Sequence, residues 1–120
     1  MLINLSNHPS AKWSNEQLTV AESYGRIVDL PFPEVNPNGD EKYIDQLAND
    51  YSYKVMSMAG DSNLTVHIMG EMTFTFALVS LLKSNSINCI ASTTERIVNE
   101  FGNGQKQATF RFVRFRKYIL

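Results

Sequence analysis

The sequence has little of what marks a secreted, disulfide-linked or membrane protein. Its 120 residues include one cysteine, Cys89, so no intrachain disulfide can form, which is typical of a reducing compartment. No apolar run approaches the roughly 20 residues that a membrane helix needs. The opening segment, MLINLSNHPS, lacks the charged stretch and the long apolar stretch of a signal peptide. We therefore expect a cytoplasmic protein with no membrane partner.

Excess charge and metal-binding patterns are missing as well. The formal net charge is −1, which gives no general attraction to long nucleic acid or to a membrane surface. The spacings HxxxH and CxxC do not occur and the acidic residues form no tight cluster, so we predict no metal site and no cofactor. The charge is nevertheless uneven, because residues 101–120 hold five Lys or Arg and no acid. The C-terminal segment is therefore a local basic element.

The residues that are present favour one domain over residues 1–120, built from alternating strands and helices. Apolar residues make up 43% of the chain, which is enough for one core. Ser14 and Gln17 have the spacing of a capping box, and apolar residues at the helical period follow Asp40. We predict strands at 2–6, 26–32, 64–69 and 87–91, helices at 15–24, between Asp40 and Gly60 and at 73–82, and a hairpin at 96–119 that turns at 102–104.

This alternation predicts the fold class: α/β, with a Rossmann-like, mostly parallel sheet flanked by helices and a C-terminal antiparallel β-hairpin. Strand–helix–strand units make right-handed crossovers and therefore parallel strands. A hairpin at the end of the chain adds an antiparallel margin to such a sheet. The helix at 73–82 is apolar on nearly every side, so we expect it to be buried.

Polar segments follow three of the predicted strands. Ligands of open parallel sheets bind beyond the carboxyl ends of the strands, where the strand order reverses. If the first, third and fourth strands are neighbours, the three segments converge at such a point. The segments are Ser6–Asn7–His8, Gly70–Glu71–Met72–Thr73–Phe74–Thr75 and Ser92–Thr93–Thr94–Glu95–Arg96.

The segment after the third strand has the composition of an anion site. Gly70 lets a ligand approach the backbone closely, and the start of the next helix offers free N–H groups. Thr73 and Thr75 add hydroxyl donors. The alternative is a tight turn in which a threonine only caps the helix. We hold both interpretations open.

The other two segments supply a cation and a titratable ring. Arg96 beside three hydroxyls suits the oxygens of a phosphate, unless it pairs with Glu95 or Glu100. His8 is a candidate general base or a cation for a phosphate, and the alternative is an ordinary loop residue before a proline. These residues make a polyanion the favoured ligand.

The basic strip at residues 111–116 alternates cations with aromatic or branched residues. Such a strip binds single-stranded nucleic acid, or it protects an edge strand from aggregation. We favour the edge role unless the strip borders the pocket. His67 and Cys89 lie inside apolar strands, and we expect both to be structural.

Four stretches together carry a resemblance to a known family. They are Asn4–Leu5–Ser6–Asn7–His8, Gly70–Glu71–Met72–Thr73–Phe74, Ser92–Thr93–Thr94–Glu95–Arg96 and Phe112–Val113–Arg114–Phe115–Arg116–Lys117–Tyr118. The chain thereby resembles, over most of its length, the small stand-alone CRISPR-associated proteins of type III systems, which are single Rossmann-like domains related to the CARF sensor fold. Several of those proteins are ring nucleases, which open cyclic oligoadenylate second messengers and end antiviral signalling.

The resemblance implies a homodimer that holds cyclic tetra-adenylate across its two-fold axis. It implies metal-independent cleavage, in which a ribose 2′-hydroxyl attacks the neighbouring phosphate, His8 or else Glu71 moves the proton, and Arg96 stabilises charge. A non-catalytic sensor or sponge remains open, as does an accessory domain for another nucleotide. The pocket residues implied by the resemblance are Ser6, Asn7, His8, Gly70, Glu71, Thr73, Thr93, Thr94 and Arg96.

Overall fold

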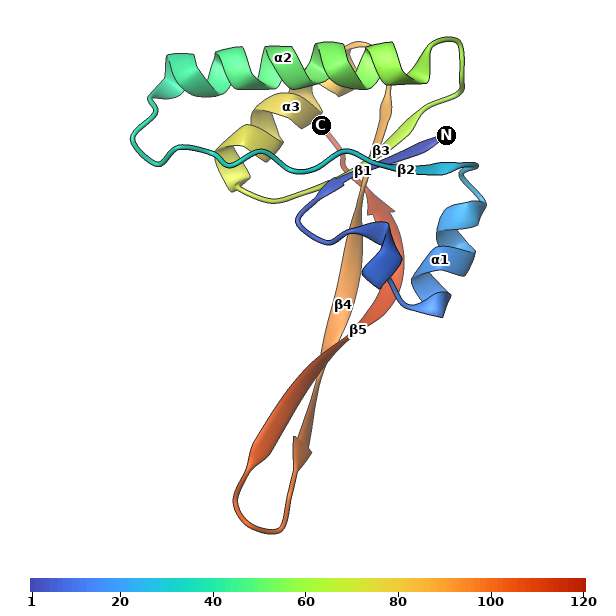
Figure 1. The fold of residues 1–120 in the computed structure, drawn as a ribbon, viewed down its shortest axis with the longest axis vertical. Helices are drawn as coiled ribbons and strands as arrows, with labels where there is room; N and C mark the ends of the chain where they lie inside the picture. Colours follow the sequence, from blue (N-terminus) through green and yellow to red (C-terminus); the bar gives the residue numbers. More distant parts are fainter.

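A single five-stranded sheet organises the chain in the computed structural model, which describes residues 1–120 (Figure 1). The strand order is β2-β1-β3-β4-β5; the first four strands are parallel, and β5 runs antiparallel to β4. The fold is therefore the expected α/β class with a Rossmann-like sheet and a C-terminal hairpin, and β1, β3 and β4 are neighbours. The strands are β1 Leu2–Ser6, β2 Ile27–Asp29, β3 Thr65–Met69, β4 Asn88–Glu100 and β5 Lys106–Lys117.

Three α-helices and one short 3₁₀ turn connect the strands. Ser14 accepts a hydrogen bond from the backbone N–H of Gln17 and so caps α1, and Asp40 caps α2 in the same way through Tyr43. Both caps confirm the predicted helix starts. Helix α1 covers one face of the sheet, while α2 and α3 cover the other (Figure 1). The elements are η1 Ser10–Lys12, α1 Asn15–Glu22, α2 Glu41–Ala59 and α3 Met72–Ser84.

The alternation of side chains along the strands divides the interior into two layers. The larger core lies between the sheet and the helices α2 and α3, and its apolar members include Ile3, Val66 and Phe74. A smaller cluster lies under α1, where Leu2 and Trp13 are buried. Because successive strand residues point to opposite faces, β1 and β3 contribute to both layers.

Two predicted strand boundaries and one prediction of burial are wrong. The fourth strand does not end at residue 91, because β4 continues to Glu100 and pairs with β5 from Ile90 onward. The second strand is short, and residues 30–40 lead on to α2 without regular structure. Helix α3 is not buried on all sides, since Met72 and Phe76 are 82% and 72% exposed.

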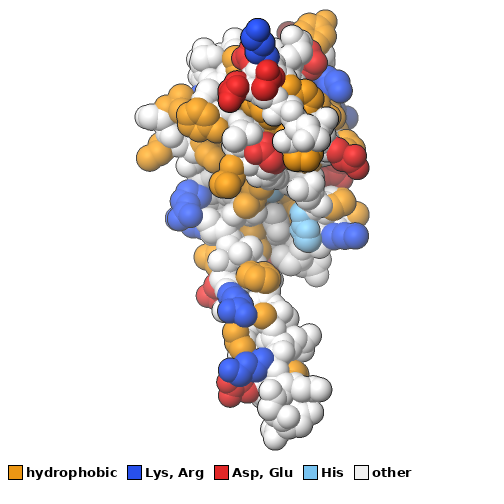
Figure 2. Space-filling view, turned by 90° about the vertical axis from the view of Figure 1, so that its left-hand side faces the viewer, with side chains coloured by type: hydrophobic (Ala, Val, Ile, Leu, Met, Phe, Trp, Pro, Cys, Tyr) orange, Lys and Arg blue, Asp and Glu red, His pale blue; other side chains and the backbone are white.

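The long β4–β5 hairpin projects from the body as an arm (Figure 1). Lys and Arg side chains alternate with hydrophobic ones along this arm (Figure 2). A bulge between Thr93 and Thr94 shifts the pairing register, and it lets Phe112 and Phe115, three residues apart, both pack under α1. As expected, β5 forms the edge of the sheet. None of the helices is both long enough and apolar enough to pass through a bilayer.

Candidate functional site

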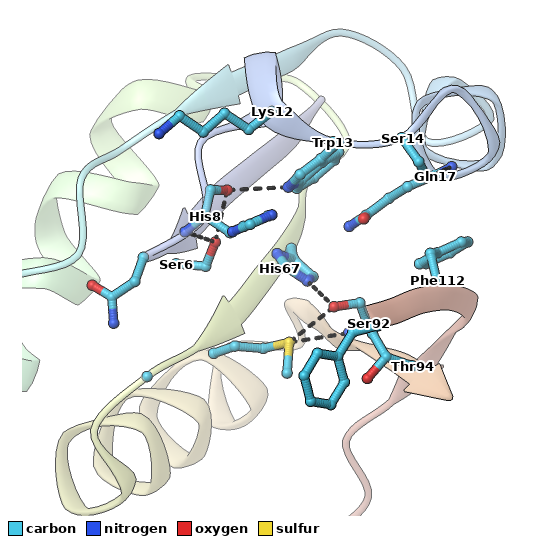
Figure 3. Close-up of a pocket in the computed structure, with 14 residues that line it drawn as sticks. Ser6, His8, Lys12, Trp13, Ser14, Gln17, His67, Ser92, Thr94 and Phe112 are labelled. Carbon is cyan, nitrogen blue, oxygen red and sulfur yellow. Dashed lines mark hydrogen bonds between the residues drawn. The ribbon is translucent and has the colours of Figure 1, made fainter. Parts of the chain in front are cut away.

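A cavity of about 760 Å³ opens on the α1 face of the sheet, at the carboxyl ends of β1 and β3. These two strands flank the point where the strand order reverses, which is where ligands bind in open α/β sheets. The arm and the segment between β1 and α1 form its sides (Figure 3). Fourteen residues line it: Ser6, Asn7, His8, Lys12, Trp13, Ser14, Gln17, His67, Met69, Gly70, Ser92, Thr94, Phe110 and Phe112.

The floor of the cavity is a buried polar network centred on Asn4 and His67. Both side chains are 1% exposed, and they lie directly opposite each other on β1 and β3. The amide nitrogen of Asn4 donates to the carbonyl oxygen of His8 at 2.9 Å and to a carboxylate oxygen of Asp29 at 2.8 Å. Two acceptors on one side fix the amide orientation, so Oδ1 of Asn4 faces His67.

The hydrogen bonds of Asn4 determine which nitrogen of His67 carries the proton. Oδ1 of Asn4 lies 2.9 Å from Nδ1 of His67 and can only accept, so Nδ1 donates. In the neutral ring Nε2 is then an acceptor, and it lies 3.3 Å from Oγ of Ser92 (Figure 3). The side chains of Asn4, His67 and Ser92 therefore form a chain of hydrogen bonds across three adjacent strands.

Burial keeps the His67 ring neutral. The ring is enclosed by the edges of Trp13 and Phe115, whose centroids lie 5.3 and 5.5 Å from its own. Loss of water disfavours the imidazolium and lowers the pKa of His67 to about 4. The accepting lone pair on Nε2 is thus available throughout the neutral pH range.

The other end of the network is anchored by a carboxylate. Burial alone would raise the pKa of Asp29, but hydrogen bonds from Asn4 and from the side chain and backbone of Ser10 outweigh it, and the pKa falls below its usual value. Asp29 therefore stays ionised and connects the end of β2 to the turn that carries His8. That turn is also fixed by Trp13, whose indole nitrogen donates to the His8 carbonyl oxygen at 3.0 Å.

The structure confirms that the three predicted segments meet. The members that line the cavity are Ser6, Asn7, His8, Gly70, Ser92 and Thr94. His8 is exposed, and its ring points into the space between β1 and β4 (Figure 3). No three His, Cys, Asp or Glu side chains gather in a way that would hold a metal ion.

The segment after β3 does not present a free helix terminus. The carboxylate of Glu71 accepts from the backbone N–H groups of Thr73 and Phe74 and from the hydroxyl of Thr73, so it caps α3 itself. These hydrogen bonds, first those from Thr73, lower the pKa of Glu71. In this structure a carboxylate of the chain occupies the terminus, which agrees with the alternative of a capped turn, although the capping residue is Glu71 and not a threonine. Neither Glu71 nor Thr73 lines the cavity.

Gly70 also has a different reason to be glycine. A Cβ built on it would lie 2.2 Å from the ring of Phe32, which in turn packs against Phe74 with ring centroids 5.3 Å apart. Gly70 thus makes room for the segment after β2 as well as bordering the cavity. Thr75 faces a second, mostly apolar cavity of about 350 Å³ beside α3, and its hydroxyl oxygen is buried without a partner.

The segment after Ala91 lies within a strand and not in a loop. Thr93 is directed away from the cavity, and its hydroxyl donates to the backbone oxygen of Arg114. Arg96 lies further along the arm and does not line the cavity. It pairs across the ladder with Phe110. This pair lies two positions beyond the pair of Thr94 and Phe112 and therefore on the same face.

The ion pairs expected for Arg96 are made by other residues. Glu95 pairs with Arg111, and Glu100 pairs with Lys106. The guanidinium of Arg96 is therefore exposed and without an acidic partner next to the cavity. Phe112 of the basic strip lines the cavity together with the neighbouring Phe110, so the strip borders the pocket. This position favours a binding role for the strip in addition to its place at the edge of the sheet.

Sequence reasoning missed several lining residues. His67 was assigned to the core because Val66 and Ile68 flank it, yet the same alternation puts His67 on the opposite face, beside Asn4. Lys12 belongs to a short turn that sequence patterns did not indicate. Ser14 and Gln17 were recognised only as helix-capping residues, although both line the cavity, as does Trp13.

The model of the uncharacterized protein MJ1673 family matches residues 1–116 of the chain. Neither the curated proteins nor the solved structures include a match to it.

Proposed function

We propose a function for this chain, which belongs to the uncharacterized protein MJ1673 family: it binds cyclic oligoadenylate, with cyclic tetra-adenylate as the first candidate, and opens the ring without a metal ion. The reaction is attack of a ribose 2′-hydroxyl on the adjacent phosphate. It ends type III CRISPR signalling in the cytoplasm. The cavity on the α1 face is the binding site.

The observation that carries this proposal is the convergence of Ser6–His8, Gly70 and Ser92–Thr94 on one cavity at the strand-order reversal. Hydroxyl-bearing residues of two strands line it together with His8 and Lys12. Phe110, which is 68% exposed, offers a flat surface on which a purine base stacks. Hydroxyls, cations and an aromatic face are the groups that a nucleotide requires.

The size of the cavity favours a homodimer. Cavities of roughly 300–1,000 Å³ hold drug-sized ligands, and a ring of four nucleotides is larger than these. One cavity of about 760 Å³ therefore holds part of the ring. Two copies related by a two-fold axis supply two equal halves to a symmetric ligand.

Several lining residues, and Arg96 next to the cavity, have separate roles in this reaction. Lys12 and Arg96 neutralise phosphate charge and stabilise the charge that develops at the reacting phosphorus. His8 transfers a proton at the reacting phosphate. Asn7 and Thr94 hold the ring so that the 2′-oxygen lies in line with the departing 5′-oxygen.

A specific observation favours a second candidate, a sensor or sponge that binds the ring without cutting it. The amides at the start of α3 are occupied by Glu71, so they do not serve as an oxyanion site. Binding needs only the cavity, whereas cleavage also needs groups that stabilise the transition state.

Two measurements test both candidates. Cyclic tetra-adenylate should raise the thermal midpoint of the protein in proportion to the logarithm of ligand concentration. Incubation with the same ligand in EDTA should give linear product with a 2′,3′-cyclic phosphate end. A midpoint shift with an intact ring selects the sponge, and the absence of a shift with any ring size rejects both candidates.

A further inference from the structure

Three side chains on three adjacent strands form a directed hydrogen-bond chain at the base of the cavity. Asn4 on β1 fixes the Nδ1–H tautomer of His67 on β3, and Nε2 of His67 faces the hydroxyl of Ser92 on β4. The order amide–imidazole–hydroxyl is the arrangement in which a base, oriented by a third group, withdraws a proton from a hydroxyl. The roles proposed above for the other lining residues do not use this hydrogen-bond chain.

The geometry points to a proton relay: we propose that the Ser92 hydroxyl accepts the proton of the attacking ribose 2′-hydroxyl while passing its own proton to Nε2 of His67. Ser92 is the catalytic residue of this relay, because it borders the cavity that the substrate would occupy. His67 is a positioning residue that acts through Ser92, since only 1% of its surface is exposed. This relay rests on the proposed function and names the proton acceptor of that reaction.

Competing partners of Ser92 are weaker than His67. The hydroxyl of Ser92 also lies 3.0 Å from the sulfur of Met69. A thioether sulfur is a weak acceptor, whereas the neutral imidazole nitrogen is a strong one. The sulfur steadies the hydroxyl in the apo protein without removing its proton. His8, by contrast, has an exposed ring with no hydrogen bond to the protein, so nothing orients it as a base.

The relay and His8 together balance the reaction. The 2′-oxygen forms a bond to phosphorus, its proton moves to Oγ of Ser92, and the Ser92 proton moves to Nε2 of His67. The bond from phosphorus to the 5′-oxygen breaks, and the His8 imidazolium gives that oxygen a proton. The products are a 2′,3′-cyclic phosphate and a 5′-hydroxyl. Nε2 of His67 then returns its proton to Oγ of Ser92, which releases one to solvent water, and solvent water reprotonates His8.

The imidazolium formed on His67 in this step is short-lived and lies close to the negative phosphate. Burial opposes a permanent charge on this ring. A transient positive charge beside the developing negative charge on the phosphoryl oxygens is favourable, because both are shielded from water. The walls of Trp13 and Phe115 hold the ring in place during the transfer.

The test compares single-turnover cleavage and equilibrium binding of cyclic tetra-adenylate in EDTA for wild type, Ser92→Ala, Ser92→Thr and His67→Asn. The asparagine side chain retains a donor toward Asn4 but has no basic nitrogen. Thr109→Ala is the matched control, because it removes a hydroxyl from an exposed position on the opposite face of the arm.

We expect Ser92→Ala and His67→Asn to slow cleavage by about 100-fold or more, the usual contribution of a general base. Their dissociation constants should stay within about threefold of wild type, and Ser92→Thr should recover most of the rate. The rate of Thr109→Ala should equal that of wild type. Recovery by threonine separates proton transfer from a packing role. If His67→Asn does not fold, the Ser92 pair still decides the question.

Three results overturn the relay, and they differ in what else they reject. Ser92→Ala that cleaves within about threefold of wild type rejects the relay alone. A wild-type protein that binds the ring and leaves it intact rejects the relay and the nuclease, while the sponge remains. A wild-type protein that does not bind rejects the relay together with the proposed function.

Discussion

The two faces of the sheet are made by alternate residues of the same strands, yet they differ in chemistry. On the α2–α3 face, Ile3 and Val66 join a large cluster of apolar side chains. On the α1 face, the adjacent residues Asn4 and His67 are equally buried but belong to a polar network. A buried polar group must be hydrogen-bonded to be tolerated, and each of these has its partners. The comparison indicates that one face stabilises the domain and the other builds a site.

This difference has a simple structural origin. Helices α2 and α3 cover their face closely, whereas α1 is short and packs mainly against β5. The carboxyl ends of β1 and β3 are therefore left open on the α1 side, where the cavity forms.

The largest expected effect is on the apolar face. Phe74 is fully buried between the rings of Phe32 and Tyr51, so Phe74→Ala should lower the free energy of unfolding by about 3–5 kcal/mol. Urea denaturation measures this loss. Phe76→Ala, on the exposed side of the same helix, should change stability by about 0.5 kcal/mol or less. Equal losses in the two variants would contradict the assignment of the stabilising layer.

The next largest effect concerns pH and the polar face. The pKa of His67 is about 4 in the folded protein and about 6.5 in a free chain, so the unfolded state binds more protons between these values. Stability from this group is complete above pH 6.5 and is lost as the pH falls toward 4. The total loss is about 3 kcal/mol.

Denaturation curves recorded from pH 7 to pH 4 test this dependence. The free energy of unfolding of wild type should decline across the whole interval, and that of His67→Gln should decline much less, because glutamine does not titrate. Carboxylates such as Asp29, whose pKa is lowered, lose their contribution mainly below this interval. Parallel curves for the two proteins would show that His67 is not the group responsible.

A third, smaller effect on stability is expected at Gly70, which follows β3 and contacts both Phe32 and the cavity. Gly70→Ala would place a methyl group against the Phe32 ring, and the resulting strain should cost about 1–3 kcal/mol. Gly102→Ala serves as the control, because nothing lies within 4 Å of its added Cβ. In a double-mutant cycle, Phe32→Ala should remove most of the Gly70→Ala cost. Additive losses would mean that Gly70 serves the cavity and not the packing of Phe32.

The smallest effect separates capping from catalysis. Glu71→Ala removes the cap of α3 and should lower stability by about 1 kcal/mol, measured by thermal denaturation. Its cleavage rate for cyclic tetra-adenylate, where cleavage is observed, should stay at the wild-type value. A large loss of rate with intact binding would return Glu71 to the list of proton-transfer candidates.

Local patterns predicted the elements well where the signal lies within one segment. The side chains of Ser14 and Asp40 cap α1 and α2 because each reaches a backbone N–H only three residues away. The turn at 102–104 is confirmed for the same local reason. The predicted end of β4 failed, because the hydroxyl-rich stretch after Ala91 is held in a strand by pairing with β5, a partner more than 15 residues away.

The candidate site was predicted only in part. Convergence of three segments followed from the general geometry of parallel sheets, and Ser6, His8 and Ser92 do line the cavity. Residues whose position depends on a distant neighbour were misjudged. Glu71 turned out to cap its own helix, and His67 acquired its environment from Asn4, 63 positions earlier in the chain.

The sequence alone determined the fold class, because hydrophobic period, capping residues and turn residues act over a few positions and are visible in any short window. Only the tertiary structure decided which face each strand residue meets and what lies opposite it. That choice placed Asn4 beside His67, Phe32 against Gly70 and the arm beside the cavity. Such contacts depend on strand order and register, which are set by the packing of the whole chain and not by any single segment.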